Sequence, residues 1–317
     1  MEKYKLKESV INSVMAIVFS SILIYLTEGF GDLYSFILLI PFIVVFIHGG
    51  INHWLISITV VGGLAFILKD IYVFIFLMSY VVLTSLLVGI SYRKGIRLRY
   101  IVRNSSYLTF SLIILGLFLT YYVLNVNPVE MLRDMMRTAV DSTVNTMKFP
   151  IDVSSDQIGD MAVELKKYID VSISLLPSLI FIYSYVLVFI NVFIALKIVN
   201  SNEKDERYNL KLNTLSLGKD FKVLVLTVIA IGIMNSVFSI QYLDIIFSNL
   251  LMIISVFLFF NGVLMMDFAY EKKVNIIIRL ILLFIFIVVI RAYMAFVIVG
   301  GLDLIFNLRK RRLKNEI

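Results

Sequence analysis

The stretch that decides the fold runs from Phe36 to Arg103 and reads FILLIPFIVVFIHGGINHWLISITVVGGLAFILKDIYVFIFLMSYVVLTSLLVGISYRKGIRLRYIVR. Its first part, Phe36 to Leu68, contains no Asp, Glu, Lys or Arg. A membrane-spanning helix requires about 20 consecutive apolar residues, so this is membrane sequence. Short loops rich in Lys and Arg stay in the cytoplasm, so the basic end orients the other segments. Its basic residues are Arg93, Lys94, Arg97, Arg99 and Arg103.

The composition excludes a soluble fold. Hydrophobic residues make up 60% of the chain and charged ones 16%, and the mean hydropathy is +0.96. Soluble domains average roughly 45–50% and 25%. The net charge of +7 comes from bases in short loops between apolar runs, which indicates anchoring on an anionic bilayer surface rather than nucleic-acid binding. The absence of cysteine excludes disulfides, thiolate catalysis and cysteine-ligated metals.

Charge boundaries divide the chain into nine or ten apolar segments. The fold class that follows is an all-α, polytopic membrane helix bundle. The first eight segments are Val10 to Leu26, Leu33 to His48, Trp54 to Leu68, Ile71 to Ile90, Ser105 to Leu124, Val171 to Leu196, Val223 to Ile240 and Ile245 to Met266.

The last apolar stretch, Val274 to Leu308, leaves the count open. It is too long for one upright span and short for two. A hairpin turning near Arg291 would return the basic tail, Arg309 to Lys314, to the cytoplasm, whereas a single crossing would leave it outside. We therefore favour ten crossings over nine, with both termini in the cytoplasm.

The only long polar stretch, residues 127–171, separates membrane segments 1–126 from the C-terminal part, 172–317. It is net acidic, so we place it outside the cytoplasm. Apolar residues recur at three- and four-residue steps after Pro128 and again after Pro150, which predicts two amphipathic helices. We interpret them as surface helices on the outer face of the bundle, with a lid or a partner-docking element as the alternative.

Small and polar residues inside the apolar runs have two interpretations. Small residues let helices approach closely, which indicates packing or docking positions at Ala16, Ser20, Gly62, Gly63 and Gly262. Amide side chains in apolar runs either line a ligand cavity or tie helices together. The candidate ligand-binding residues are Asn191, Asn235 and Asn261.

Nothing in the sequence indicates catalysis. His48 and His53 are the only histidines, and their five-residue spacing across a glycine turn does not match a zinc pair on one helix. Familiar nucleotide-binding and hydrolase motifs are absent, so we expect neither an enzyme nor a resident cofactor or metal. Asp303 lies deep in the last apolar stretch and could pair with Arg309 or Arg311, or face a neighbouring helix.

Short motifs resemble a known family. Leu176-Pro177, Asn261-Gly262 and the terminal Gly301-Leu302-Asp303 followed by Arg309 resemble the YybS-like predicted membrane proteins of Firmicutes, a domain of unknown function. The family-motif positions are Pro177, Gly301, Asp303 and Arg309. This resemblance implies a multi-pass protein of the bacterial cytoplasmic membrane.

The proline and glycine pattern is more distantly similar to the substrate-binding components of energy-coupling-factor transporters and to the MreD cell-shape proteins. In those transporters an Ala-x-x-x-Ala pair docks the coupling subunit, and Ala16 and Ser20 stand at that spacing. Two functions follow from these similarities: a small-molecule binding or transport module, or a non-catalytic scaffold that recruits a membrane or cytoplasmic protein partner.

Overall fold

The computed structural model describes residues 2–30, 37–68, 71–146, 155–203, 217–238, 241–271, 274–289 and 292–309. Every regular element in these ranges is a helix. The elements are α1 (Glu2–Phe30), α2 (Leu39–Leu68), α3 (Ile71–Arg93), α4 (Leu98–Leu124), α5 (Pro128–Thr146), α6 (Ser155–Ser174), α7 (Leu176–Glu203), α8 (Lys219–Phe238), α9 (Gln241–Tyr270), α10 (Ile276–Phe284), the π-helix η4 (Ile285–Val289) and α11 (Tyr293–Phe306).

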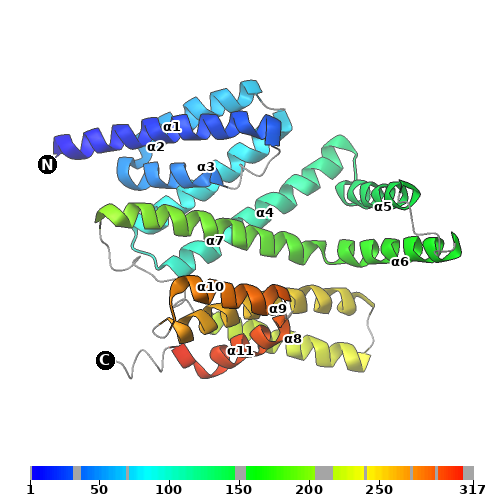
Figure 1. Cartoon of the computed structure of the whole chain (residues 1–317). Helices are drawn as coiled ribbons and strands as arrows, with labels where there is room; N and C mark the ends of the chain where they lie inside the picture. Colours follow the sequence, from blue (N-terminus) through cyan, green and yellow to red (C-terminus); the bar gives the residue numbers. More distant parts are fainter. Residues whose placement is uncertain are drawn as a thin grey trace. The chain divides into compact units, whose positions relative to one another are not determined.

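The chain forms two compact units. The first comprises residues 1–128 and 183–209, and the second residues 129–182 and 210–317. Helix α7 therefore begins in the second unit and continues in the first. In the first unit α2 packs against both α1 and α3, and α3 packs against α4 (Figure 1).

The break inside α2 explains why the sequence predicts two short segments there. Gly50 has φ +78° and ψ −174°, a conformation that side chains disfavour, so the helix turns at this glycine. The end of the first half exposes carbonyl groups, and Arg93 of α3 donates hydrogen bonds to Phe46 O (3.1 Å) and Ile47 O (3.4 Å). A side chain thus satisfies backbone groups that the turn leaves without helical partners.

The basic loop after α3 is a tight turn with an identifiable cause. Gly95 has φ +70°, its N–H donates to Tyr92 O (2.8 Å), and the N–H of Ile96 donates to Ser91 O (3.0 Å). This pair of bonds is the Schellman motif that ends many helices at a left-handed glycine. The motif leaves only a few residues between α3 and α4, so the basic side chains lie at one end of the helix pair.

In the second unit α9 packs against α8, α10 and α11 (Figure 1). Helices α10 and α11 are separate elements, as a hairpin in the last apolar stretch requires. The predicted turn residue Arg291 lies outside the described residues, and the N–H of Ala292 donates to Phe286 O (3.0 Å) beside it.

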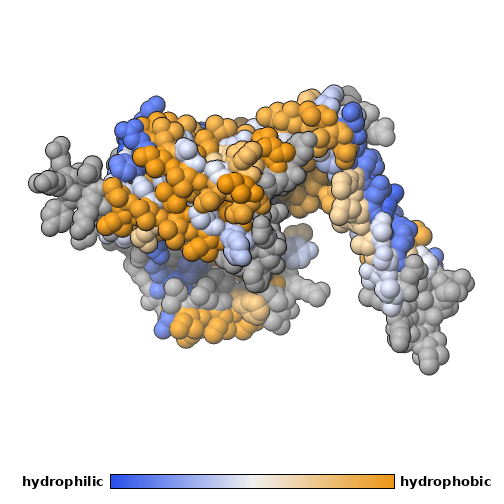
Figure 2. Space-filling model, turned by 90° about the horizontal axis from the view of Figure 1, so that it is seen from above, coloured by the Kyte–Doolittle hydropathy of each residue, from blue (hydrophilic) through white to orange (hydrophobic). Residues whose placement is uncertain are grey.

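The helices have the lengths and surfaces of membrane spans. Four stretches are long and apolar enough to cross a bilayer, and shorter apolar stretches accompany them among the described residues. Many large apolar side chains are exposed, and Figure 2 shows them across much of the face it presents. The four long stretches are Leu39–Leu68, Leu98–Leu124, Leu176–Ser201 and Leu243–Tyr270; the shorter ones are Ser9–Tyr25, Met78–Arg93, Phe221–Val237 and Tyr293–Phe306. The count of nine or ten crossings stays a prediction.

Two glycines set the contact between α9 and α11. A Cβ on Gly262 would lie 1.9 Å from Phe296 O, and one on Gly300 would lie 1.9 Å from Leu258 O. Backbone therefore meets backbone at this crossing, which only glycine permits.

We expect Gly262→Ala to destabilise the protein by about 1–3 kcal/mol or more, because the methyl group would collide with a backbone carbonyl that cannot move aside. Gly301→Ala is the matched control, since no atom outside its own helix lies within 4 Å of its Cβ position. Thermal unfolding of the purified variants in detergent would measure the difference. Equal losses in both variants would contradict the close crossing.

Candidate functional site

A buried charged network lies beside the glycine crossing. Asp303 of α11 and Arg309 are 2% and 1% exposed, and Asn261 of α9 is 3% exposed. Arg309 donates to Asp303 Oδ2 from Nε (3.0 Å) and Nη2 (2.7 Å), and Nη2 also donates to Asn261 Oδ1. Asn261 Nδ2 in turn donates to Gly300 O (2.9 Å) and Asp303 Oδ2 (3.2 Å).

The local backbone explains how Arg309 returns to Asp303. Helix α11 ends at Asn307, which has φ +51°, a left-handed conformation that asparagine tolerates better than most residues. The turn brings the N–H of Arg309 to Asp303 Oδ1 (3.2 Å) as well as its guanidinium to Oδ2. The network therefore neutralises a buried carboxylate and ties the end of α11 to the middle of α9.

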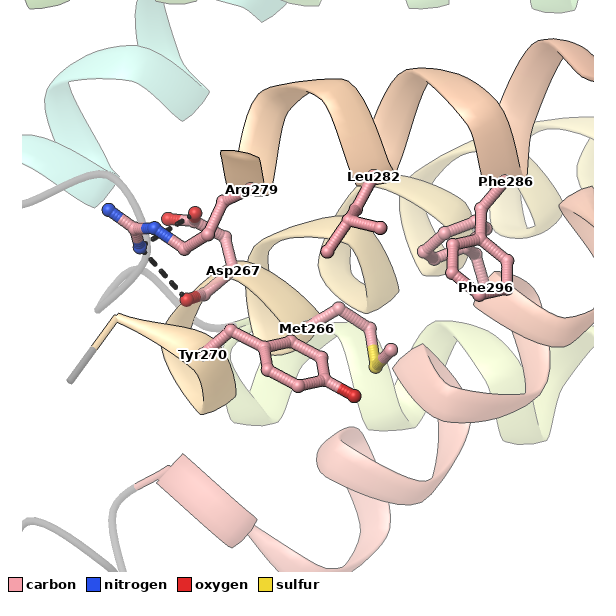
Figure 3. A pocket seen from close by; sticks show the side chains of 7 residues that line it. All are labelled: Met266, Asp267, Tyr270, Arg279, Leu282, Phe286 and Phe296. Carbon is pink, nitrogen blue, oxygen red and sulfur yellow. Dashed lines mark hydrogen bonds and ion pairs between the residues drawn. The ribbon is translucent and has the colours of Figure 1, made fainter. Parts of the chain in front are cut away.

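A cavity of about 240 Å³ lies among α9, α10, η4 and α11 in the same unit. Figure 3 shows Arg279 and Asp267 at one end, Phe286 and Phe296 at the other, and Leu282 and Met266 between them. Tyr270 completes the lining. The interior is thus apolar along most of its length and polar at one end.

The polar end of the cavity is the ion pair between Arg279 of α10 and Asp267 of α9. Arg279 Nη1 lies 2.8 Å from Asp267 Oδ1 and donates to Asp267 O (3.1 Å). The pair is largely buried, with side-chain exposures of 10% and 26%. Because the two charges cancel, this end offers hydrogen bonds rather than a net charge. One wall is the π-helix η4, a rare conformation that is frequent at functional sites.

The three predicted asparagines have different partners. Asn191 belongs to the first unit, where it is fully buried and donates to Leu187 O (2.8 Å). Asn235 lies on α8 and donates to Asp244, and Asn261 lies in the charged network. Asn235 and Asn261 each bond a residue on another helix, and neither lines the cavity.

The predicted packing positions have different surroundings. Ala16 and Ser20 are buried within the first unit, so they contact the unit's own helices rather than presenting a free docking surface. A Cβ on Gly62 would lie 2.9 Å from Met78 Cε, whereas Gly63 has open space. Atoms of other helices thus lie close to Gly62 and Gly262 but not to Gly63.

The basic residues have two roles. Arg93 caps the break in α2 and lies over the Phe46 ring, 5.2 Å from its centre. Arg99 and Arg103 lie over Tyr100 at 4.8 and 4.9 Å, and Arg99 also donates to its hydroxyl (2.9 Å). Lys94, Arg97 and Arg99 are exposed, so this end of the first unit presents positive charge. His53 Nδ1 lies 2.8 Å from Gly49 O, a contact within the turn.

Sequence reasoning missed Asn249. Its side chain bonds both the N–H of Ser178 and Ser174 O across the junction of α6 and α7. The signal was Pro177, because a proline inside an apolar run leaves backbone groups that need a partner from elsewhere. The partner itself could not be found from spacing, since it lies more than 70 residues further along the chain.

The fold and its exposed apolar surface define an all-helical, multi-pass membrane protein. The chain belongs to the family described as predicted membrane protein (DUF2232), whose model matches residues 13–304 and so includes both units. No curated protein and no solved structure matches the chain.

We expect Asp303→Leu to cost about 3–5 kcal/mol of stability, because Arg309 would remain buried and charged without its partner. The double variant Asp303→Leu/Arg309→Met should regain most of that loss, since neither charge then has to be desolvated. Glu130→Leu is the control, because it breaks a surface pair worth about 0–1 kcal/mol. Denaturant unfolding in detergent measures all three; no recovery in the double variant would contradict the pairing.

Proposed function

We propose that the protein is a membrane binding module for a small, largely apolar molecule with one polar group, which it takes from the bilayer into the cavity between α9, α10 and α11. The observation that carries the proposal is the cavity itself, apolar over most of its lining and closed at one end by Arg279 and Asp267. Small-molecule sites commonly combine an apolar lining with a few placed polar groups.

The route into the cavity is from the side. The lining residues Leu282 and Phe286 are 39% and 40% exposed, so they belong to the outer surface as well as to the cavity. Ile278 and Phe284 of α10 are also large, apolar and exposed. Such a surface faces lipid in a membrane protein. A ligand dissolved in the bilayer would therefore reach the cavity without crossing water.

The polar end sets the class of ligand. Arg279 and Asp267 together carry no net charge, so a hydroxyl or amide can exchange hydrogen bonds with the pair, whereas an isolated charge would have to break it. The proline and glycine pattern, which distantly resembles that of energy-coupling-factor substrate-binding components, favours binding as one step of transport. In this proposal the cavity, rather than the three asparagines, binds the cargo.

Photolabelling tests the cavity with a diazirine-bearing octanol as the probe. In liposomes containing the full chain we expect saturable labelling of peptides from α9 and α10, which excess octanol suppresses. Met266→Trp should abolish that labelling because the indole occupies the cavity, whereas Leu226→Trp on the exposed face of α8 should not. Mass spectrometry identifies the labelled peptides. Labelling that is not saturable, or is equal in both variants, would refute the proposal.

A scaffold role is the second candidate, and the exposed bases at the start of α4 favour it. Arg97 and Arg99 are exposed, and Arg99 and Arg103 hold Tyr100 between them. An acidic surface of a cytoplasmic partner would complement this cluster. The distant resemblance of the proline and glycine pattern to MreD proteins favours the same role.

We expect Arg97→Glu/Arg99→Glu to remove a cross-linked protein neighbour in intact cells without unfolding the chain. Arg97 caps α4 through its backbone carbonyl and not its side chain, so the substitution leaves that cap in place, whereas the Arg93 side chain does bond a helix end. Lys166→Glu on α6 is the control, because it also reverses a surface charge but lies outside the arginine cluster. Site-specific photo-cross-linking from position 103 provides the measurement. If the cross-linked neighbour is retained in Arg97→Glu/Arg99→Glu, docking at this cluster is excluded.

A further inference from the structure

The pattern of helical backbone hydrogen bonds is interrupted at the junction of α6 and α7, where a single residue separates the two helices. Helix α6 ends at Ser174 and α7 begins at Leu176, with Pro177 in its first turn. Proline has no N–H, and its ring crowds the carbonyl four residues before it. The backbone here therefore lacks a helical hydrogen bond.

Asn249 of α9 satisfies the backbone groups beside that break. The N–H of Ser178 donates to Asn249 Oδ1 (3.0 Å), and Asn249 Nδ2 donates to Ser174 O (2.8 Å). In an uninterrupted helix these two backbone groups would bond each other, four residues apart. One amide side chain thus stands between them, with Asn249 9% and Ser178 1% exposed.

Further contacts place the amide firmly. Asn249 Nδ2 also donates to Ile245 O (2.9 Å) on its own helix. The Ser178 hydroxyl donates to Leu175 O (2.7 Å) and lies 3.2 Å from Met252 Sδ, one turn along α9. The junction is therefore attached to α9 by side chains and contains fewer backbone bonds than the helices on either side.

The elements on the outer side of the junction form one body. Arg137 of α5 donates to both carboxylate oxygens of Asp170 on α6, at 2.9 Å each. Lys166 lies 2.7 Å from Asp141 further along the same pair. These bridges connect α5 and α6 along their length, so the α5–α6 hairpin can change its angle without changing its internal structure.

We propose that the α6–α7 junction is a hinge for the α5–α6 hairpin, and that the Asn249 amide of α9 closes it. With the amide in place the hairpin has one fixed angle to α9. Without it, the groups around Pro177 lose their partners and the hairpin samples several angles. The proposal is independent of the cavity and of any ligand.

Electron–electron distance measurements test the hinge in the full chain reconstituted in liposomes. The chain contains no cysteine, so spin labels can be placed without removing any native residue. One label pair, Val163→Cys with Leu251→Cys, reports the angle between the hairpin and α9. A second pair, Met135→Cys with Val163→Cys, lies within the hairpin; all these side chains are exposed.

In the chain that carries only the label substitutions, we expect one narrow distance distribution for each label pair. Asn249→Leu should broaden the first distribution at least twofold and leave the second unchanged. Asn249→Asp, which retains the acceptor and loses the donor, should broaden the first by less. Asn235→Leu is the matched control, since that asparagine lies on α8 and does not contact the junction.

Pro177→Ala distinguishes a hinge from a general loss of structure. Alanine supplies the missing N–H and removes the ring that crowds the carbonyl of Ile173, so the N–H of Ser178 can bond Ser174 O directly, as in an uninterrupted helix. The junction then no longer depends on Asn249, and Pro177→Ala/Asn249→Leu should return the first distance to its native width. Three results would overturn the proposal: an unchanged first distance in Asn249→Leu, equal broadening of both pairs, or no restoration in the double variant.

Discussion

Inside a bilayer no water bonds to the peptide groups, so each interruption of a helix needs a partner from within the protein. At three interruptions among the described residues, a side chain supplies that partner. Arg93 donates to the carbonyls at the break in α2, and the Asn249 amide bridges the break before α7. Asp303 accepts the N–H of Arg309 after α11 ends. This requirement explains why these three polar side chains lie in or beside apolar runs.

The buried pair of Asp303 and Arg309 contributes more to register than to stability. Desolvating two charges offsets most of the attraction between them, so such a pair is weak evidence for a stabilising role. Its value here is that Asn261 and Gly300 O can satisfy the network only when α9 and α11 cross at Gly262 and Gly300. A shift of α11 by one residue would keep the Asp303–Arg309 pair, which is local to the end of α11, but would break the buried hydrogen bonds to Asn261. Buried polar groups without partners would make this shift cost more than a shift between purely apolar faces.

Sequence alone predicts those features that depend on local chemistry. The apolar lengths predict helices, Gly50 predicts the turn in α2, and the net acidic stretch predicts two amphipathic helices, which the structure has as α5 and α6. The site depends on contacts between distant residues. Asn249 and Asn235 both lie in apolar runs, and only the fold places one of them across a helix break. The cavity likewise depends on how α9, α10, η4 and α11 pack together, which no periodicity encodes.

Helix α9 connects these features within the second unit. Asn249 near its beginning bonds the α6–α7 junction, Asn261 and Gly262 in its middle contact α11, and Asp267 near its end pairs with Arg279 of α10. A helix is stiff along its axis, whereas each of these contacts is a hydrogen-bonded or close-packed arrangement with few alternatives. The helices around α9 therefore have their positions set by a single element, and any displacement of α10 or α11 at the cavity has to be accommodated by contacts along that same element.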